Sequence, residues 1–301
     1  LLKNDYARRK SIYINSLFKF MSSFNRGIFY IILGSFWWGV IGVIYFRELS
    51  FVGSVELVLH RVFWTAVMLT ITTIYFSKWR KILNIIKNKK NLIYLTLTSF
   101  LIFLNWSVWI YAVSTNQIVD ASFGYFIMPI ISIYLGYFFL KEKFSLKGKV
   151  SVLIVAISIL YLIISDFESI PWVGLIVAIS WSFYNLLRKI INVDTDIGLL
   201  IESLFILPVI VIAFYFIVKN NVNDFDLSNP KLMFVFMLAG PMTVIPLYLY
   251  VRGVELCGLG PTGMIFYITP SLQFFLGYFL YNEPLNTDKL ISFIFIWIAV
   301  F

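Results

Sequence analysis

Long stretches without a charged side chain constrain this sequence more than any other feature. Residues 28–46, 121–140 and 232–251 each contain no Asp, Glu, Lys or Arg. About 20 residues of helix are enough to cross the hydrocarbon core of a bilayer, which is roughly 30 Å thick. Charged residues make up only 13% of the 301 positions, well below the usual share in soluble domains, and apolar residues make up 60%. The sequence therefore predicts an all-α membrane protein.

Hydrophobic stretches separated by charged breaks predict ten transmembrane helices. We expect them at residues 28–46, 54–76, 92–113, 120–140, 149–165, 170–187, 198–218, 232–252, 260–281 and 289–301. At 1.5 Å per residue, the last stretch is only about 20 Å long. The sequence therefore predicts a truncated last helix, with the chain stopping inside its tenth span.

Lysines and arginines are divided unevenly between the two sets of alternate connections. Most of the 24 lie before the first span, between the second and third, or between the fourth and fifth. Since cytoplasmic loops carry the excess of these residues, we expect a cytoplasmic N-terminus, with residues 1–25 as a basic segment. The net charge of +9 comes mainly from these cytoplasmic lysines and arginines, which membrane insertion requires. We therefore expect no nucleic-acid partner.

A segment of the first half of the chain recurs in the second half. The sequence GYFIMPIISIYLGYFFLKEKFS, from Gly124, resembles MIFYITPSLQFFLGYFLYNEPLN, from Met264. In one register, Pro129 aligns with Pro270, the first LGYF block with the second, and Glu142 with Glu283. The chain is therefore predicted to contain two repeats, over residues 26–166 and 167–301.

The predicted number of helices gives these repeats opposite orientations. A repeat of five helices is odd, so the second copy enters the membrane inverted relative to the first. Inverted repeats are typical of secondary transporters, in which two bundles expose a central site alternately. Pro129 and Pro270 each remove a backbone hydrogen bond inside a span, so we predict helix hinges there.

The sequence VELVLHRVFW, from Val55, places three ionisable side chains in one apolar helix. Glu56 and His60 are about 40° and 6 Å apart on a helix and can touch, whereas Arg61 lies about 140° from Glu56. Arg61 therefore needs another partner, and Asp120 or an anionic group of a substrate are the candidates. A His–Glu pair can titrate near neutral pH and couple transport to protons. The alternative is that the pair only fixes the helix in place.

Further polar and aromatic residues within the spans are candidates for a substrate pathway. Ionisable groups in a span cost roughly 2.5 to 3.5 kcal/mol and usually face a cavity or a partner, which adds Glu202 to the three residues above. Aromatic faces and amides can also line a path, although many such rings only anchor a protein at the membrane interface. These candidates include Asn105, Trp106, Tyr125 and Tyr184.

Several motifs together resemble one transporter family. They are ELVLHRVFW, NWSVWIYAV from Asn105, DASFGYFIMP from Asp120, SFYNLLRK from Ser182, GLLIE from Gly198 and FYITPSLQFFLGYFLYNE from Phe266. In this order they resemble the RarD permeases of the EamA family, within the drug/metabolite transporter superfamily. The resemblance implies an inner-membrane permease built of two five-helix EamA repeats.

These observations predict a secondary-active transporter that moves a small polar metabolite or drug-like solute by alternating access. With no nucleotide-binding motif, coupling is expected to a proton or sodium gradient or to substrate exchange. With one histidine, one cysteine and no metal-ligand spacing, we expect neither an enzyme nor a cofactor or metal. The alternatives are an intramembrane transferase acting through His60, and a channel or scaffold. Besides the substrate and the lipid bilayer, a homodimer partner is left open.

Overall fold

The computed structural model describes residues 22–115, 117–143, 146–165, 172–191, 193–226, 228–282 and 287–300. Every regular element within these ranges is a helix, so the all-α prediction is confirmed. Most of the predicted basic segment 1–25, and Glu283 of the repeated segment, lie outside the described residues.

The first half of the chain contributes one interrupted span and five further helices. They are α2 (Ser23–Phe36), the π-helix η1 (Trp37–Gly42), α3 (Val43–Glu48), α4 (Ser54–Tyr75), α5 (Trp79–Lys87), α6 (Lys89–Ser114), α7 (Ile118–Leu140) and α8 (Leu146–Ser165). The short helix α5 lies within a stretch that the sequence analysis treated as a basic loop.

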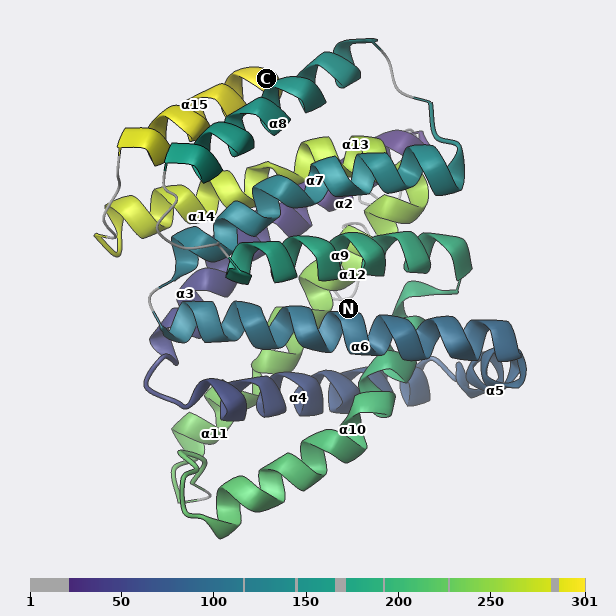
Figure 1. Ribbon diagram of the computed structural model, residues 1–301. Helices are drawn as coiled ribbons and strands as arrows, with labels where there is room; N and C mark the ends of the chain where they lie inside the picture. Colours follow the sequence, from purple (N-terminus) through teal and green to yellow (C-terminus); the bar gives the residue numbers. More distant parts are fainter. Residues whose placement is uncertain are drawn as a thin grey trace, which may run out of the picture.

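The second half repeats this order with two broken spans. It contains α9 (Trp172–Ile191), α10 (Thr195–Lys219), α11 (Pro230–Met237), α12 (Ala239–Cys257), α13 (Leu259–Phe266), α14 (Ile268–Phe279) and α15 (Thr287–Val300). The helices run side by side, with α8 and α15 paired at one end of the array and α10 at the other (Figure 1).

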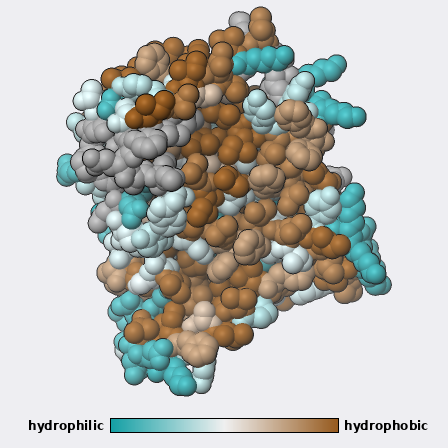
Figure 2. All heavy atoms as spheres, viewed as in Figure 1, coloured by the Kyte–Doolittle hydropathy of each residue, from teal (hydrophilic) through white to brown (hydrophobic). Residues whose placement is uncertain are grey.

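Seven helical stretches of the described chain are long and apolar enough to cross a membrane. They are Ser23–Glu48, Ser54–Tyr75, Lys89–Ser114, Ile118–Leu140, Trp172–Ile191, Thr195–Lys219 and Pro230–Cys257. Two shorter apolar helices, Lys149–Ser158 and Leu290–Ala299, accompany them. A broad hydrophobic surface lies between hydrophilic edges (Figure 2), as expected for a multi-pass membrane protein. The number of ten spans stays a prediction.

Helix packing is reciprocal between the two halves. In the first half α6 packs on α9, and in the second half α12 packs on α2, the helix that corresponds to α9. The corresponding helices α4 and α10 pack on each other, as do α8 and α15. These main contacts between the halves are thus matched by their counterparts, as expected of two related bundles around a pseudo-two-fold axis.

One pair of residues marks the place where the repeated segments meet. Phe126 and Tyr267 occupy equivalent positions, 141 residues apart, and the Tyr267 hydroxyl donates to the carbonyl oxygen of Phe126 at 3.3 Å. Their rings are stacked with centroids 5.9 Å apart. Equivalent residues can touch only close to the axis that relates them, so the two copies face each other here.

Proline accounts for both breaks in the second half. It has no N–H to donate to the carbonyl four residues earlier, and its ring crowds that carbonyl. Helix α11 ends at Met237, four residues before Pro241, and α13 ends at Phe266, four residues before Pro270. Pro129 instead lies inside the uninterrupted α7. The hinge roles of Pro129 and Pro270 stay predictions.

Candidate functional site

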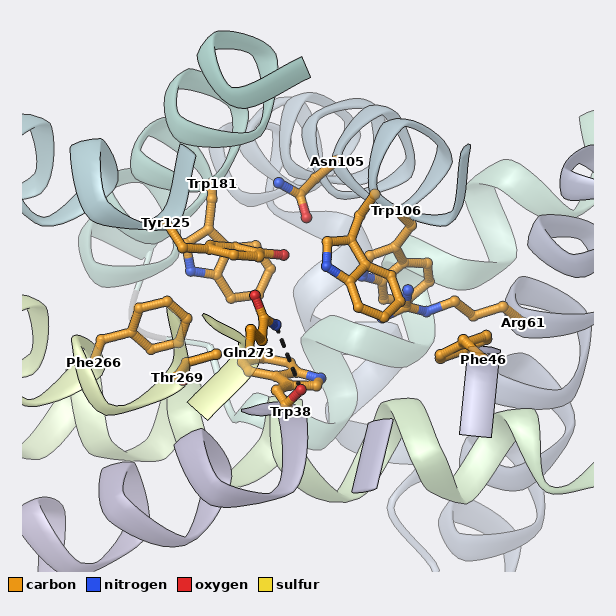
Figure 3. A pocket seen from close by; sticks show the side chains of 11 residues that line it. Trp38, Phe46, Arg61, Asn105, Trp106, Tyr125, Trp181, Phe266, Thr269 and Gln273 are labelled. Atoms are coloured by element: carbon orange, nitrogen blue, oxygen red, sulfur yellow. Dashed lines mark hydrogen bonds between the residues drawn. The ribbon is translucent and has the colours of Figure 1, made fainter. Parts of the chain in front are cut away.

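A pocket lined mainly by aromatic side chains lies between the two halves of the molecule. The first half contributes Trp38, Phe46, Arg61, Asn105, Trp106, Trp109 and Tyr125, and the second half contributes Trp181, Phe266, Thr269 and Gln273. Arg61 and Trp106 approach from one side, and Tyr125, Trp181 and Phe266 from the other (Figure 3). The cavity volume is about 20 Å³, room for roughly one or two water molecules. A metabolite therefore needs these walls to separate.

The pocket brings together four of the sequence-predicted candidates. Arg61 extends from α4, Asn105 and Trp106 from α6, and Tyr125 from α7. Because these helices also pack against the second half, any rearrangement between the halves changes the shape of this pocket.

Arg61 is held by a hydroxyl group and by aromatic rings. Its side chain is buried, and Nε donates to Thr243 Oγ1 at 3.0 Å. The guanidinium carbon lies 4.5 Å from the ring centre of Trp106, 5.6 Å from that of Trp109 and 5.1 Å from that of Phe46. Ring faces attract cations electrostatically. The Asp120 carboxylate, which was a predicted candidate for the partner of Arg61, is not among these contacts.

A π-helix places Trp38 against the pocket. Segment Trp37–Gly42 adds an extra residue per turn between α2 and α3, a feature often found at functional sites. Gly39 allows this segment to approach α14 closely, because a Cβ atom there would lie 2.8 Å from the Cβ of Leu272. The Gln273 amide nitrogen in turn donates to the carbonyl oxygen of Trp38 at 3.5 Å (Figure 3).

Glu56 and His60 face away from this pocket. Glu56 accepts hydrogen bonds from the backbone N–H groups of Asp224 and Phe225, at 2.7 and 2.9 Å, and so holds the segment that follows α10. His60 Nε2 lies 3.5 Å from Glu56 Oε1, and the imidazole stacks on Phe236 with centroids 4.1 Å apart. The predicted contact between the two is present, and both belong to the packing of α4 against α10 and α11.

Glu202 and Tyr184 belong to a second buried polar cluster. Glu202 accepts hydrogen bonds from Thr98 Oγ1 at 2.7 Å and from the Tyr184 hydroxyl at 3.2 Å. Arg188 Nη1 lies 3.6 Å from the same carboxylate, and both side chains are only 1% exposed. The guanidinium passes over Gly198, where an added Cβ would overlap it. This cluster joins α6, α9 and α10 and does not line the aromatic pocket.

The remaining charged candidate, Asp120, lies in the first turn of α7. Its backbone oxygen packs close to Gly174 near the start of α9. The side chain is partly exposed and is not part of the pocket lining. The structure therefore separates Asp120 from Arg61. Among the residues that the structure describes, no three His, Cys, Asp or Glu side chains converge as metal ligands.

Comparison with known proteins identifies the architecture around this pocket. The EamA-like transporter family model matches residues 25–164 and again residues 169–301. The chain belongs to the EamA-like transporter family. An uncharacterized transporter of Vibrio cholerae is 34% identical over 276 residues, covering 91% of this chain and 90% of that protein. Protein RarD of Salmonella typhi is 32% identical over 275 residues, covering 91% and 93%.

Further relatives agree on a RarD-type member of the EamA family. The uncharacterized transporter YojE of Bacillus subtilis is 31% identical over 280 residues, covering 91% of this chain and 92% of that protein. A solved crystal structure superimposes with a TM-score of 0.61 over 93% of this chain and 95% of the other, at 13% identity, and supports the fold alone. The chain is thus a membrane transporter of the drug/metabolite class, and these names indicate a transporter rather than an enzyme.

Glu142 of the first half contacts the start of α13 in the second half of this EamA transporter. Gly258, with a φ of 85°, turns the chain from α12 into α13. The N–H groups of Leu259 and Gly260 then donate to the two carboxylate oxygens of Glu142, at 3.0 and 3.1 Å. Helix N-termini attract anions, and here the anion is a side chain of the protein. The N-terminus of α13 is thus occupied by Glu142 of the first half.

Several residues of the two sites were not predicted from the sequence. Gln273 could have been noticed as the only amide side chain between Leu256 and Tyr281, an otherwise uncharged and largely apolar stretch. Arg188 lies one residue beyond the predicted span 170–187, yet α9 continues to Ile191 and buries it. Phe46, Thr243 and Phe266 carry no local signal, since their roles depend on contacts between distant helices.

Proposed function

We propose that this protein is a secondary-active transporter that moves a small polar metabolite or drug-like solute across the bacterial inner membrane by alternating access. The observation that supports it best is the aromatic pocket, because both halves contribute its walls. Transporters built from repeats bind their substrates where the repeats meet. In this proposal the pocket is part of the substrate path, and ten helices form two inverted repeats with a cytoplasmic N-terminus.

Two sets of hydrogen bonds outside the pocket are candidates for contacts that change between two states. Glu142 bridges to the N-terminus of α13, and Lys189 Nζ donates to the carbonyl oxygens of Val254 and Glu255 at 3.0 and 2.8 Å. The Glu142 contact joins the first half to the second, and the Lys189 contacts join α9 to α12 within the second half. We infer that they separate when the pocket opens toward the side on which most lysines lie.

Coupling is assigned to the ionisable groups that are buried outside the pocket. Glu202 with Arg188, and Glu56 with His60, each lie beside helices that pack across the two halves. A proton or sodium ion bound at either pair would change its charge and so the preferred packing of α4 on α10. Membrane-embedded carboxylates commonly serve such relays.

Transport by purified protein in liposomes tests the proposal. Vesicles without nucleotide should exchange a labelled member of a polar metabolite panel, and Trp38→Phe should slow the exchange at least several-fold. Trp172→Phe, at the exposed start of α9, is the matched control and should leave it unchanged. Absence of transport across the whole panel, with turnover of an added lipid instead, would contradict a transporter. Equal rates in both variants would remove Trp38 from the path.

A further inference from the structure

Arg61 differs from the other deeply buried arginine in having no acidic partner. Both guanidinium groups are almost fully enclosed, with Arg61 4% and Arg188 2% exposed. Arg188 is paired with Glu202, whereas none of the five ion pairs within the described residues includes Arg61. A lone buried charge is costly unless it is paired and hydrogen-bonded. One hydroxyl and three ring faces offset only part of that cost.

The pocket around Arg61 is rich in hydrogen-bond donors that lack an acceptor. Within the described residues, the only hydrogen bond of Arg61 is donated by Nε, which leaves Nη1 and Nη2 without an acceptor. The indole nitrogens of Trp106 and Trp109 are buried and also find no acceptor in the described part of the chain. An indole N–H and a guanidinium can only donate. The missing group must therefore accept several hydrogen bonds at once.

The charge of the lining sets the charge of that group. Arg61 is the only Lys, Arg, Asp or Glu among the residues that line the pocket. A single guanidinium matches a carboxylate, whose two oxygens accept from its two terminal nitrogens. A phosphate monoester carries about −1.5 to −2 charges near neutral pH and would remain partly uncompensated here. The lining thus favours a monocarboxylate.

The opposite wall favours a flat apolar body attached to the carboxylate. Trp38 and Trp181 are packed edge to face with centroids 5.2 Å apart, and Phe266 lies 6.3 Å from Trp38. Gln273 Oε1 is buried there without a donor, so it can accept from a hydroxyl or amino group on the far end of the same ligand. Separation of the walls is needed to admit such a molecule.

We propose that the solute carried by this transporter is a small organic monocarboxylate with a planar, largely apolar body, and that Arg61 binds its carboxylate. The inference rests on the proposed function only in treating the ligand as the transported solute. Binding itself can be measured without transport.

A binding experiment with matched probes tests it. Purified full-length protein in detergent is titrated with benzoate, benzamide and benzylamine, which share one ring and differ in charge, and tryptophan fluorescence and thermal stability are recorded. Benzoate should bind at least tenfold more tightly than the other two. Arg61→Gln should abolish this preference, and Arg61→Lys should retain part of it. Lys219→Gln, an exposed cation at the end of α10, should keep it.

The outcomes separate this inference from the proposed function. Equal binding of the three probes, or a preference for benzoate that survives Arg61→Gln, overturns the monocarboxylate site. If liposomes then exchange a neutral or cationic solute, transport stands and only the substrate class is wrong. If benzoate binds through Arg61 but no carboxylate is exchanged, the anion site stands and the transport proposal fails. Circular dichroism of each variant confirms that it is folded.

Discussion

At the residue scale, the two buried arginines show how similar side chains are accommodated differently. Arg188 pairs with Glu202, whose carboxylate also accepts hydrogen bonds from Thr98 and Tyr184, whereas Arg61 lies among rings beside Thr243. The sequence predicted that Arg61 needs a partner other than Glu56, because helix geometry follows from spacing alone. It could not supply Thr243, which is 182 residues away, since the register of distant helices depends on their packing.

Breaking the Arg188–Glu202 pair is expected to destabilise the protein. Arg188→Met or Glu202→Leu leaves one charge buried alone, which should lower the free energy of unfolding by about 3–5 kcal/mol. The double variant leaves no lone charge and should recover much of that loss. Thermal unfolding in detergent measures all three. A double variant less stable than both single variants would contradict the expected coupling.

Gly198 is expected to be intolerant of even a methyl group. A Cβ there would overlap the Arg188 guanidinium, so Gly198→Ala must displace a buried charge from its partner. Overpacking of this kind costs about 1–3 kcal/mol, which should lower the midpoint of thermal unfolding. Gly53→Ala is the matched control, because nothing lies within 4 Å of the added atom. Equal midpoints for the two variants would show that the guanidinium moves freely.

At the element scale, the sequence predicted where helices lie better than how they are interrupted. Apolar runs marked the long spans, since each must cover the thickness of the membrane. The π-helix at Trp37–Gly42 and the end of α11 at Met237 left no sign in hydropathy. Pro241 explains the end of α11 only once it is known that α12 continues the same span beyond Met237. The amphipathic α5 was not predicted because its basic residues Arg80, Lys81 and Lys87 made the stretch look like a loop.

The Glu142 cap is expected to stabilise the start of α13. Glu142→Gln keeps the size of the side chain but replaces one of the two accepting oxygens with an NH₂ group. An NH₂ group only donates, so it cannot accept a hydrogen bond from the second backbone N–H. Hydrogen exchange at Leu259 and Gly260 should therefore become faster, while exchange in α6 stays unchanged. Glu48→Gln, which alters an exposed carboxylate, serves as control. Unchanged exchange at both amides would argue against a role for the cap.

At the scale of the whole molecule, matched contacts between the halves indicate two related units, and their inverted orientation stays a prediction. The repeated segment predicted two related units before any contact was known, because proline, LGYF and glutamate recur in one register. The sequence did not predict which helices of one unit pack against which helices of the other. The meeting of Phe126 with Tyr267 shows that the repeated segments face each other.

Orientation in the membrane can be tested by labelling single cysteines. Cys257, the only cysteine, is first replaced by serine. In intact cells, a membrane-impermeant maleimide should then label Asn220→Cys, at the end of α10, but not Lys87→Cys, at the end of α5. Both positions are exposed, so a difference reports the side of the membrane. After permeabilisation both should react. The reverse pattern would place the N-terminus outside.

The small volume of the aromatic pocket also bears on what the protein does between transport events. A space of about 20 Å³ between these rings has room for roughly one or two water molecules. Protons and small ions need a continuous file of water to leak down their gradients. We therefore expect an idle copy of this protein to leave the membrane electrically tight, so that a cell could carry many copies without dissipating the potential that drives its other transporters.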